Sequence, residues 1–137
     1  MNYRTQSFAD AVLEATGGEG VDVVLDHVGP PHLAQHLRVL RNGGRLVVIG
    51  LMGGSKGELD LGAMLRKRAA VIATTLRARP AAGKAAICAS VVEHVWPLVA
   101  DGRIRPVVHT STPLDRVADA HRSMEASDHI GKLLLTT

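Results

Sequence analysis

The run from Gly43 to Gly54, Gly-Gly-Arg-Leu-Val-Val-Ile-Gly-Leu-Met-Gly-Gly, constrains the fold more than any other part of this chain. Its apolar centre predicts a strand that begins after one glycine turn and ends in a second glycine-rich loop. This pattern is typical of the ligand edge of a parallel sheet, because backbone amides are free there and glycine allows a close approach. We therefore expect residues 50–54 to lie at a ligand-binding edge.

The segments before this run complete a strand-helix-strand unit. Val21–Asp26 is rich in β-branched residues and is bounded by glycines, which favours a buried parallel strand. Pro30-Pro31 then opens a helix whose leucines recur at helical spacing. Glycines end this helix before a second strand at Arg45–Ile49. The order predicts one βαβ unit.

The rest of the chain continues the alternation of helices and strands. Ser7 and Asp10 form a possible capping pair for the first helix. The other expected elements are a helix at 8–16, a helix at 61–66, a strand at 71–76, a helix at 84–100 that Pro97 kinks or ends, a strand at 106–110, a helix at 114–126 and a strand at 132–135. The predicted class is α/β, a partial Rossmann-type parallel sheet with flanking helices followed by a C-terminal strand-helix-strand segment.

Composition narrows the possible partners and locations. The 137 residues are 46% hydrophobic, which suits a folded unit, and the net charge is only +3. One Trp, one Tyr and one Phe leave few stacking platforms, so we expect no nucleic-acid partner. No apolar stretch approaches the roughly 20 residues that cross a bilayer, so we expect no membrane partner and a cytoplasmic location. The lone Cys88 is expected to be a buried thiol.

The seven histidines do not follow a metal-binding motif. His32 and His36 are the only close helical pair, and two ligands do not make a site. We therefore predict no metal, and surface or hydrogen-bonded core positions for His32, His36, His94 and His121. His27 follows a strand end and is a candidate for the ligand edge.

The remaining candidates for a ligand-binding site are distinguished by whether they follow a strand or a helix and by the spacing of their glycines. Gly17–Gly20 follows a helix and precedes a strand, the reverse of a phosphate cradle, and is expected to be a cap and turn. Gly50–Gly57 has the correct direction but neither common phosphate-loop spacing, so a plain loop and a ligand loop remain equal alternatives. Asp26 lacks the glycine fingerprint about 20 residues upstream that a ribose-binding acid has, so we expect it to hold the strand-end turn. Arg77 and Arg79 either solvate a loop or clamp an anion.

Six segments taken in order resemble the zinc-free quinone oxidoreductases of the medium-chain dehydrogenase/reductase superfamily. They are residues 2–4, 20–26, 43–45, 50–54, 75–79 and 124–132, and the resemblance covers nearly the whole chain. It implies an enzyme that passes hydride from NADPH, rather than NADH, to a quinone or to an enone or other activated carbonyl. It also implies that residues 1–103 belong to a dinucleotide-binding domain and that 104–137 return to a substrate domain.

The resemblance further implies a set of cofactor-binding residues. Tyr3 corresponds to the tyrosine beside the adenosine 2′-phosphate, and Val28 lies at the cofactor edge. Gly50-Leu51-Met52 corresponds to the loop that reaches the nicotinamide side, and Thr75-Leu76-Arg77 to a second cofactor-facing segment. His129 stands where close relatives carry an Asn that reaches the cofactor. We assign no catalytic residue.

The resemblance also bears on partners and on completeness. The last sheet strand of such enzymes commonly pairs across a dimer, which implies a homodimer through the edge at Val71–Leu76. The Gly-rich pyrophosphate loop and the amino-terminal domain of the family are missing, so the chain is expected to be a fragment or to need a further polypeptide. Two alternatives remain open: part of a class I methyltransferase, and a non-enzymatic oligomerising or binding module.

Overall fold

The computed structural model describes residues 5–137, which form two compact units that meet in the sequence after Arg79. The first comprises residues 5–79 of the described chain and the second residues 80–137. This division falls earlier than the domain boundary expected after residue 103. The boundary after residue 103 separates the parts that are expected to belong to the cofactor domain and to the substrate domain of a larger enzyme, and it stays a prediction.

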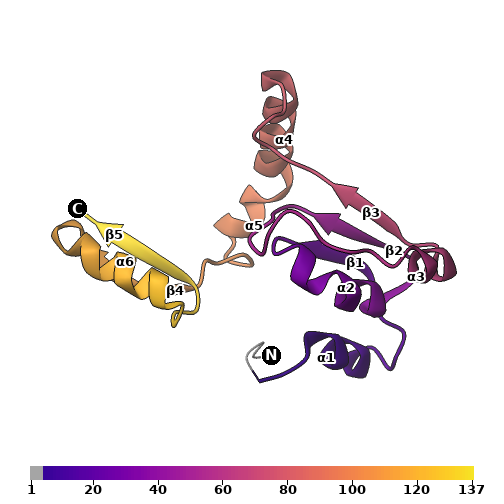
Figure 1. Cartoon of the computed structure of the whole chain (residues 1–137). Helices are drawn as coiled ribbons and strands as arrows, with labels where there is room; N and C mark the ends of the chain where they lie inside the picture. The colour runs from indigo at the N-terminus through magenta and orange to yellow at the C-terminus, as the bar shows by residue number, and fades with distance from the viewer. Residues whose placement is uncertain (1–4) are drawn as a thin grey trace. The chain divides into compact units, whose positions relative to one another are not determined.

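The first unit is a three-stranded parallel sheet with helices (Figure 1). Its elements are α1 (Phe8–Ala15), β1 (Val21–Asp26), the 3-10 turn η1 (Pro30–His32), α2 (Leu33–Val39), β2 (Leu40–Val48), α3 (Leu61–Lys67) and β3 (Ala70–Ala73). The strand order is β1-β2-β3, so both connections are crossovers between parallel neighbours. This confirms the expected α/β class and the first βαβ unit.

Pairing between β1 and β2 explains where the second strand begins. Leu40 makes an early pair with Val21, and regular register starts only where Arg45 lies opposite Val23. The four residues 41–44 between these pairs bulge out of the ladder around the Gly43-Gly44 turn. The strand predicted from Arg45 is therefore the regular part of a longer element.

The core of this unit is small and lies against β2. Leu37 from α2 and Leu40 and Leu46 from β2 are buried together. Partly buried apolar side chains surround them, namely Val24, Leu33, Val48, Leu59, Ala63, Met64 and Ala69. Burial of an aliphatic side chain of this size contributes about 1.5–3 kcal/mol. This cluster therefore fixes α2 and α3 against the central strand.

The first helix begins at the predicted capping pair. The Oγ atom of Ser7 accepts a hydrogen bond from the backbone N–H of Asp10 at 3.3 Å. The Asp10 carboxylate also contacts the Ser7 side chain, and it pairs with Arg38 of α2 at 2.7 Å. Its hydrogen bond with Ser7, and then the nearby Arg38, lower the pKa of Asp10 below its ordinary value. The ion pair joins α1 to α2.

The second unit contains the C-terminal strand-helix-strand segment. Its elements are α4 (Ala81–His94), α5 (Trp96–Ala100), β4 (Val108–Pro113), the 3-10 turn η2 (Leu114–Arg116), α6 (Val117–Ala126) and β5 (Lys132–Thr136). The strands β4 and β5 are parallel neighbours joined through α6, as predicted. The break that Pro97 was expected to cause in the helix over 84–100 is confirmed, because the helix is interrupted at Val95, where Pro97 in the first turn of α5 has no N–H to continue the earlier helix.

Two expectations are wrong in detail. The third strand ends at Ala73 rather than at residue 76, since Ala73 pairs with Val48, the last residue of β2. Beyond that point β2 has turned into the glycine-rich loop and offers no further ladder. Cys88 is exposed rather than buried. No helix within residues 5–137 is long and apolar enough to cross a membrane.

Candidate cofactor edge

The carboxyl ends of the three parallel strands of the first unit lie at one edge of the sheet, which we call the carboxyl edge. Backbone hydrogen bonds continue past the strand ends and join the loops that follow β1 and β2. Met52 N–H donates to the carbonyl of His27 at 3.1 Å, and Gly53 N–H donates to that of Val28 at 2.7 Å. These two loops are therefore fixed to each other.

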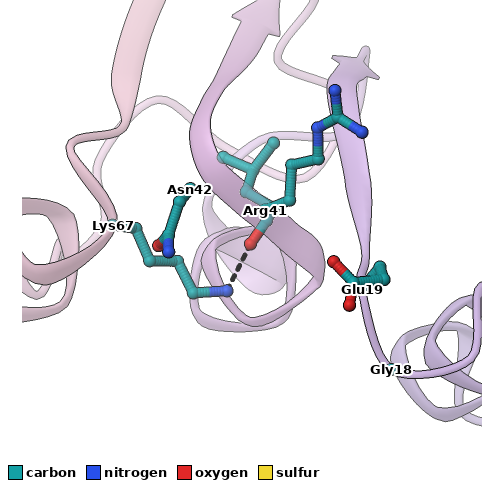
Figure 2. A pocket seen from close by; sticks show the side chains of 6 residues that line it. Gly18, Glu19, Arg41, Asn42 and Lys67 are labelled. Carbon is teal, nitrogen blue, oxygen red and sulfur yellow. Dashed lines mark hydrogen bonds between the residues drawn. The ribbon is translucent and has the colours of Figure 1, made fainter.

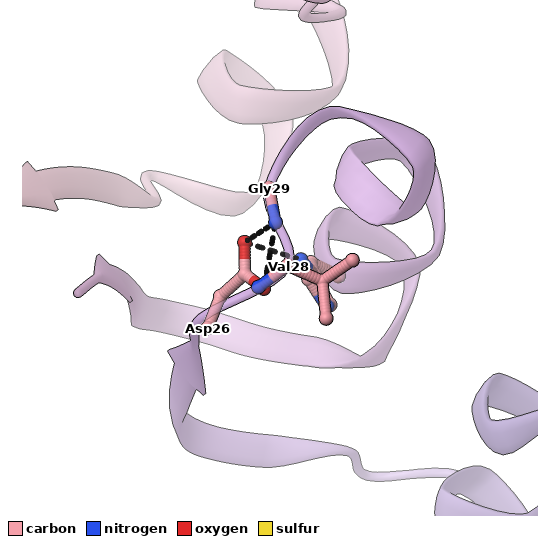
Figure 3. A network of polar contacts seen from close by, with 4 residues as sticks. Asp26, Val28 and Gly29 are labelled. Carbon is pink, nitrogen blue, oxygen red and sulfur yellow. Dashed lines mark hydrogen bonds and ion pairs between the residues drawn. The ribbon is translucent and has the colours of Figure 1, made fainter. Parts of the chain in front are cut away.

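Asp26 organises the first of these loops. Its side chain is almost fully buried, and one carboxylate oxygen accepts the N–H of Val28 at 2.8 Å (Figure 3). The N–H of Gly29 lies 3.0 Å from both oxygens. Gly29 has φ +89° and ψ −131°, a conformation that a side chain would strain. The turn-holding role predicted for Asp26 is confirmed.

The second loop combines a close backbone approach with exposed apolar side chains. A Cβ atom on Gly50 would lie 2.9 Å from the carbonyl oxygen of His27, closer than side chains tolerate. Leu51 and Met52 follow, with 53% and 82% of their surface exposed. A tightly held backbone thus presents two large apolar side chains to solvent. Such a surface suits contact with an apolar group better than with water.

The third loop leaves β3 beside the second. Thr74 N–H donates to the carbonyl of Val48 at 3.1 Å, and the guanidinium of Arg79 donates to the Thr74 hydroxyl at 3.1 Å. Arg79 therefore braces this loop. Between these residues, Thr75-Leu76-Arg77 is exposed. The structure thus brings together Val28, residues 50–52 and residues 75–77 at the carboxyl edge.

Two predicted site residues, His129 and Tyr3, are not among those placed at the carboxyl edge. His129 lies in the second unit, where its Nδ1 is 3.3 Å from the carbonyl of Ser123 and its ring faces that of His109. Tyr3 lies outside the described residues. The cofactor contacts assigned to these two side chains stay predictions.

Sequence reasoning missed the surroundings of two histidines. His32 and His36 pack against the ring of Phe8, and the Nδ1 atom of each is buried without a hydrogen-bond partner among residues 5–137. The expected surface or hydrogen-bonded positions are wrong for these two atoms. Burial lowers the pKa of His36 below its ordinary value, although the nearby Asp26 opposes this shift. The one feature of the sequence that hints at this arrangement is an acid at the end of a strand, Asp26, followed by a histidine in the next helix, His36.

A groove of 860 Å³ runs along the outer side of β1. Its lining is mainly apolar and comes from α1, β1, α2 and the first two loops: Phe8, Val12, Val21, Val23, Val24, Leu25, Asp26, His27, Val28, His32, His36, Val39, Met52 and Gly53. Among the described residues, β1 pairs only with β2, so this groove follows an open strand edge.

A second pocket, of 540 Å³, lies at the opposite edge of the sheet and is more polar. Both of its cations are already engaged. Lys67 Nζ donates to the backbone carbonyl of Leu40 (Figure 2) and to that of Arg38 at 2.7 Å, and Arg41 pairs with Asp22 at 2.5 Å. These carbonyls belong to the end of α2, where the helix dipole favours a cation over an anion. The pocket is therefore poorly suited to a phosphate group.

Metal-ligating side chains do not gather within the described part of the chain. No group of three or more His, Cys, Asp or Glu residues that could hold a metal ion occurs there. A structural or catalytic zinc ion needs three or four such ligands. The donor groups of residues 5–137 therefore do not fit a zinc site.

Comparison with known proteins gives a consistent family. Residues 1–135 match the family described as zinc-binding dehydrogenase. The chain is 32% identical over 139 residues to 2-haloacrylate reductase from a Burkholderia species, aligning 98% of this chain and 40% of that protein. It is 29% identical over 137 residues to part of the phenolphthiocerol/phthiocerol polyketide synthase of Mycobacterium tuberculosis, aligning 97% of this chain and 6% of that protein.

A solved structure supports the same fold. Escherichia coli quinone oxidoreductase complexed with NADPH superposes with a TM-score of 0.73 and 25% identity, over 98% of this chain and 42% of that one. The chain thus spans about two fifths or less of the length of these relatives. A family match of this extent overturns the methyltransferase alternative. The chain belongs to the zinc-binding dehydrogenase family, within the medium-chain dehydrogenase/reductase superfamily to which quinone oxidoreductases also belong.

Proposed function

We propose that this chain supplies the nicotinamide-side cofactor edge of an NADPH-dependent reductase whose acceptor is a quinone, an enone or another activated carbonyl. The observation that carries the proposal is the carboxyl edge of the first unit. There Val28, Gly50-Leu51-Met52 and Thr75-Leu76-Arg77, all implied to bind cofactor, follow three neighbouring parallel strands. Ligands of open α/β sheets bind outside these strand ends.

The residues at this edge fit a nicotinamide cofactor. The amides of Met52 and Gly53 are taken by the first loop, whereas those of Gly50 and Leu51 donate no backbone hydrogen bond within the described residues, so these two are available to orient a carboxamide. The exposed side chains of Leu51 and Met52 would shield an apolar ring face from water. Arg77 offers a cation to a phosphate. When bound, the cofactor supplies the hydride.

The acceptor class rests on shared chemistry. Quinones and enones both carry a carbon–carbon double bond conjugated to a carbonyl, and the name of the 2-haloacrylate reductase relative describes an acid with such a bond. Reduction adds one hydride from the cofactor and one proton. In an enone they add across the carbon–carbon double bond, which becomes a single bond, and in a quinone they convert the two carbonyls into the hydroxyls of a hydroquinone. We propose that it proceeds without zinc, as the resemblance to zinc-free quinone oxidoreductases implies. Activity that survives removal of metal by a chelator would support this.

The open edge of β1 supports a need for additional polypeptide. An apolar groove beside a strand with unpaired N–H and C=O groups is a template for another strand. We propose that a parallel strand from the remainder of such a reductase fills it. The homodimer through the edge of β3 and the cytoplasmic location also stay proposals.

Calorimetric titration of the folded chain with NADPH tests the function, with NADH and S-adenosylmethionine as comparison ligands. Saturable binding of NADPH that is weaker for NADH and absent for S-adenosylmethionine would support it. An Arg77→Ala variant should weaken NADPH binding by about tenfold, as the loss of one charged phosphate contact would. The exposed Arg68→Ala is the matched control. A folded wild-type chain that binds no nicotinamide cofactor would favour the non-enzymatic module instead.

A further inference from the structure

We propose that the buried carboxylate of Asp26 is a positioning group for the loop at 51–54. In this inference Asp26 fixes the Val28-Gly29 turn, and that turn holds the loop. Its importance for catalysis rests on the proposed function, since the loop forms part of the candidate cofactor edge. The mechanical relationship between Asp26 and the loop can be tested without any cofactor.

The first step is the burial of the charge. Asp26 is only 3% exposed, yet its carboxylate accepts backbone N–H groups from Val28 at 2.8 Å and Gly29 at 3.0 Å. Hydrogen bonds to an ionised acceptor are about twice as strong as those between neutral groups. A buried carboxylate without such donors would be strongly unfavourable. The carboxylate and the two amides therefore hold the turn in one arrangement.

The second step carries this arrangement to the neighbouring loop. The carbonyls of His27 and Val28 accept the N–H groups of Met52 and Gly53 at 3.1 and 2.7 Å. A Cβ atom on Gly29 would also lie 3.2 Å from the side chain of Leu51. The turn and the loop are thus joined by two backbone hydrogen bonds, and the space beside Gly29 leaves no room for a side chain between them. A shift of the turn must move the loop or break these bonds.

The surroundings of the carboxylate show that it does not act as the ion-pair partner of a nearby cation. Its nearest cationic candidate is His36, whose Nδ1 lies 3.6 Å from Oδ2, beyond hydrogen-bond distance. The two close partners of the carboxylate are both amides of the turn. The side chain is therefore directed at the backbone that follows it.

Amide hydrogen exchange of the full chain, followed residue by residue by NMR, tests the inference. Asp26→Asn keeps the size but loses the charge and one acceptor oxygen. We expect the Met52 and Gly53 amides to exchange at least about tenfold faster, while the buried Leu46 amide keeps its protection. The control is Asp22→Asn, an exposed acid at the other end of β1 that pairs with Arg41. Unchanged protection at Met52 and Gly53 would overturn the inference.

A second variant decides the question if Asp26→Asn does not fold. Gly29→Ala leaves the carboxylate in place but strains the turn, because φ is +89° there. The same selective release of the Met52 and Gly53 amides would support the inference. Full protection of both amides in this variant would contradict it.

Binding then connects the loop to the proposed function. Asp26→Asn should weaken NADPH by about tenfold and leave 2′-phospho-ADP-ribose, which lacks the nicotinamide, unchanged. Equal loss of both ligands would assign Asp26 a general structural role and contradict the inference. If the wild-type chain binds neither ligand, the proposed function fails for the isolated chain, and the exchange experiment still decides the role of Asp26.

Discussion

The Nδ1 atom of His36 lies 3.6 Å from Oδ2 of Asp26, and only 8% and 2% of the two side chains are exposed. Burial lowers the pKa of the histidine more than the neighbouring carboxylate raises it. A neutral His36 therefore faces the acid that holds the strand-end turn. A titratable ring therefore lies next to the residue that holds the first loop of the candidate cofactor edge.

This pair predicts a loss of stability in mild acid. Because the folded state lowers the pKa of His36 from 6.5, the unfolded chain binds more protons as the pH falls below about 6.5. The contribution is fully present above that pH and is lost as the pH falls toward the folded pKa. Urea unfolding between about pH 8 and 5 should show this loss. His36→Leu should reduce the slope, and the exposed His94→Leu should not; equal slopes in all three proteins would contradict the assignment.

Much of the carboxyl edge was predictable because it depends on chain direction. Residues after parallel strands must share an edge, so the placement of Val28, 50–52 and 75–77 follows from assigning the strands correctly. The role of Asp26 was also predictable, since a short acid at a strand end can reach the next amides. Local pattern was sufficient for these features.

Other features depend on contacts that a local pattern does not contain. The apolar character of residues 71–76 continues past Ala73, but strand length is set by Val48 on the neighbouring strand. The approach of His36 to Asp26 requires the chain to reverse through Pro30-Pro31 and then form α2. The spacing of two residues along the sequence does not specify this packing.

The close approach at Gly50 predicts a specific cost for a single methyl group. A Cβ in Gly50→Ala would lie 2.9 Å from the His27 carbonyl oxygen, so the two loops must separate. We expect a loss of about 1–3 kcal/mol in the free energy of unfolding, measured by urea denaturation. Gly83→Ala in α4 is the matched control, because its Cβ would meet no atom within 4 Å. That variant should be neutral or stabilising by about 0.5–1 kcal/mol, and a similar loss in both would refute the close-contact explanation.

Lys67 predicts a stabilising role away from the candidate cofactor edge. Its ammonium group donates to the carbonyls of Arg38 and Leu40 at the end of α2, and partial burial lowers its pKa. Lys67→Met removes both bonds while keeping the aliphatic stem. Since the site is only partly buried, we expect a loss of about 1–2 kcal/mol in unfolding free energy and little change in NADPH affinity. The exposed Lys56→Met should leave the free energy of unfolding unchanged.

The proposed homodimer predicts that a charge on β3 weakens association. Within residues 5–137, β3 pairs only with β2, and Ile72 on it is 45% exposed. If two copies pair through this edge, Ile72→Lys places an ammonium group in or beside the new contact, and a charge is a common means of blocking such edges. Sedimentation across a concentration series should then show a dimer dissociation constant at least about tenfold higher than that of the wild type.

Leu65→Lys, at an exposed position on α3 away from the strand edge, should leave the constant unchanged. A wild-type chain that is monomeric at every concentration would show that the homodimer proposal is wrong, and equal weakening by both substitutions would move the interface away from β3.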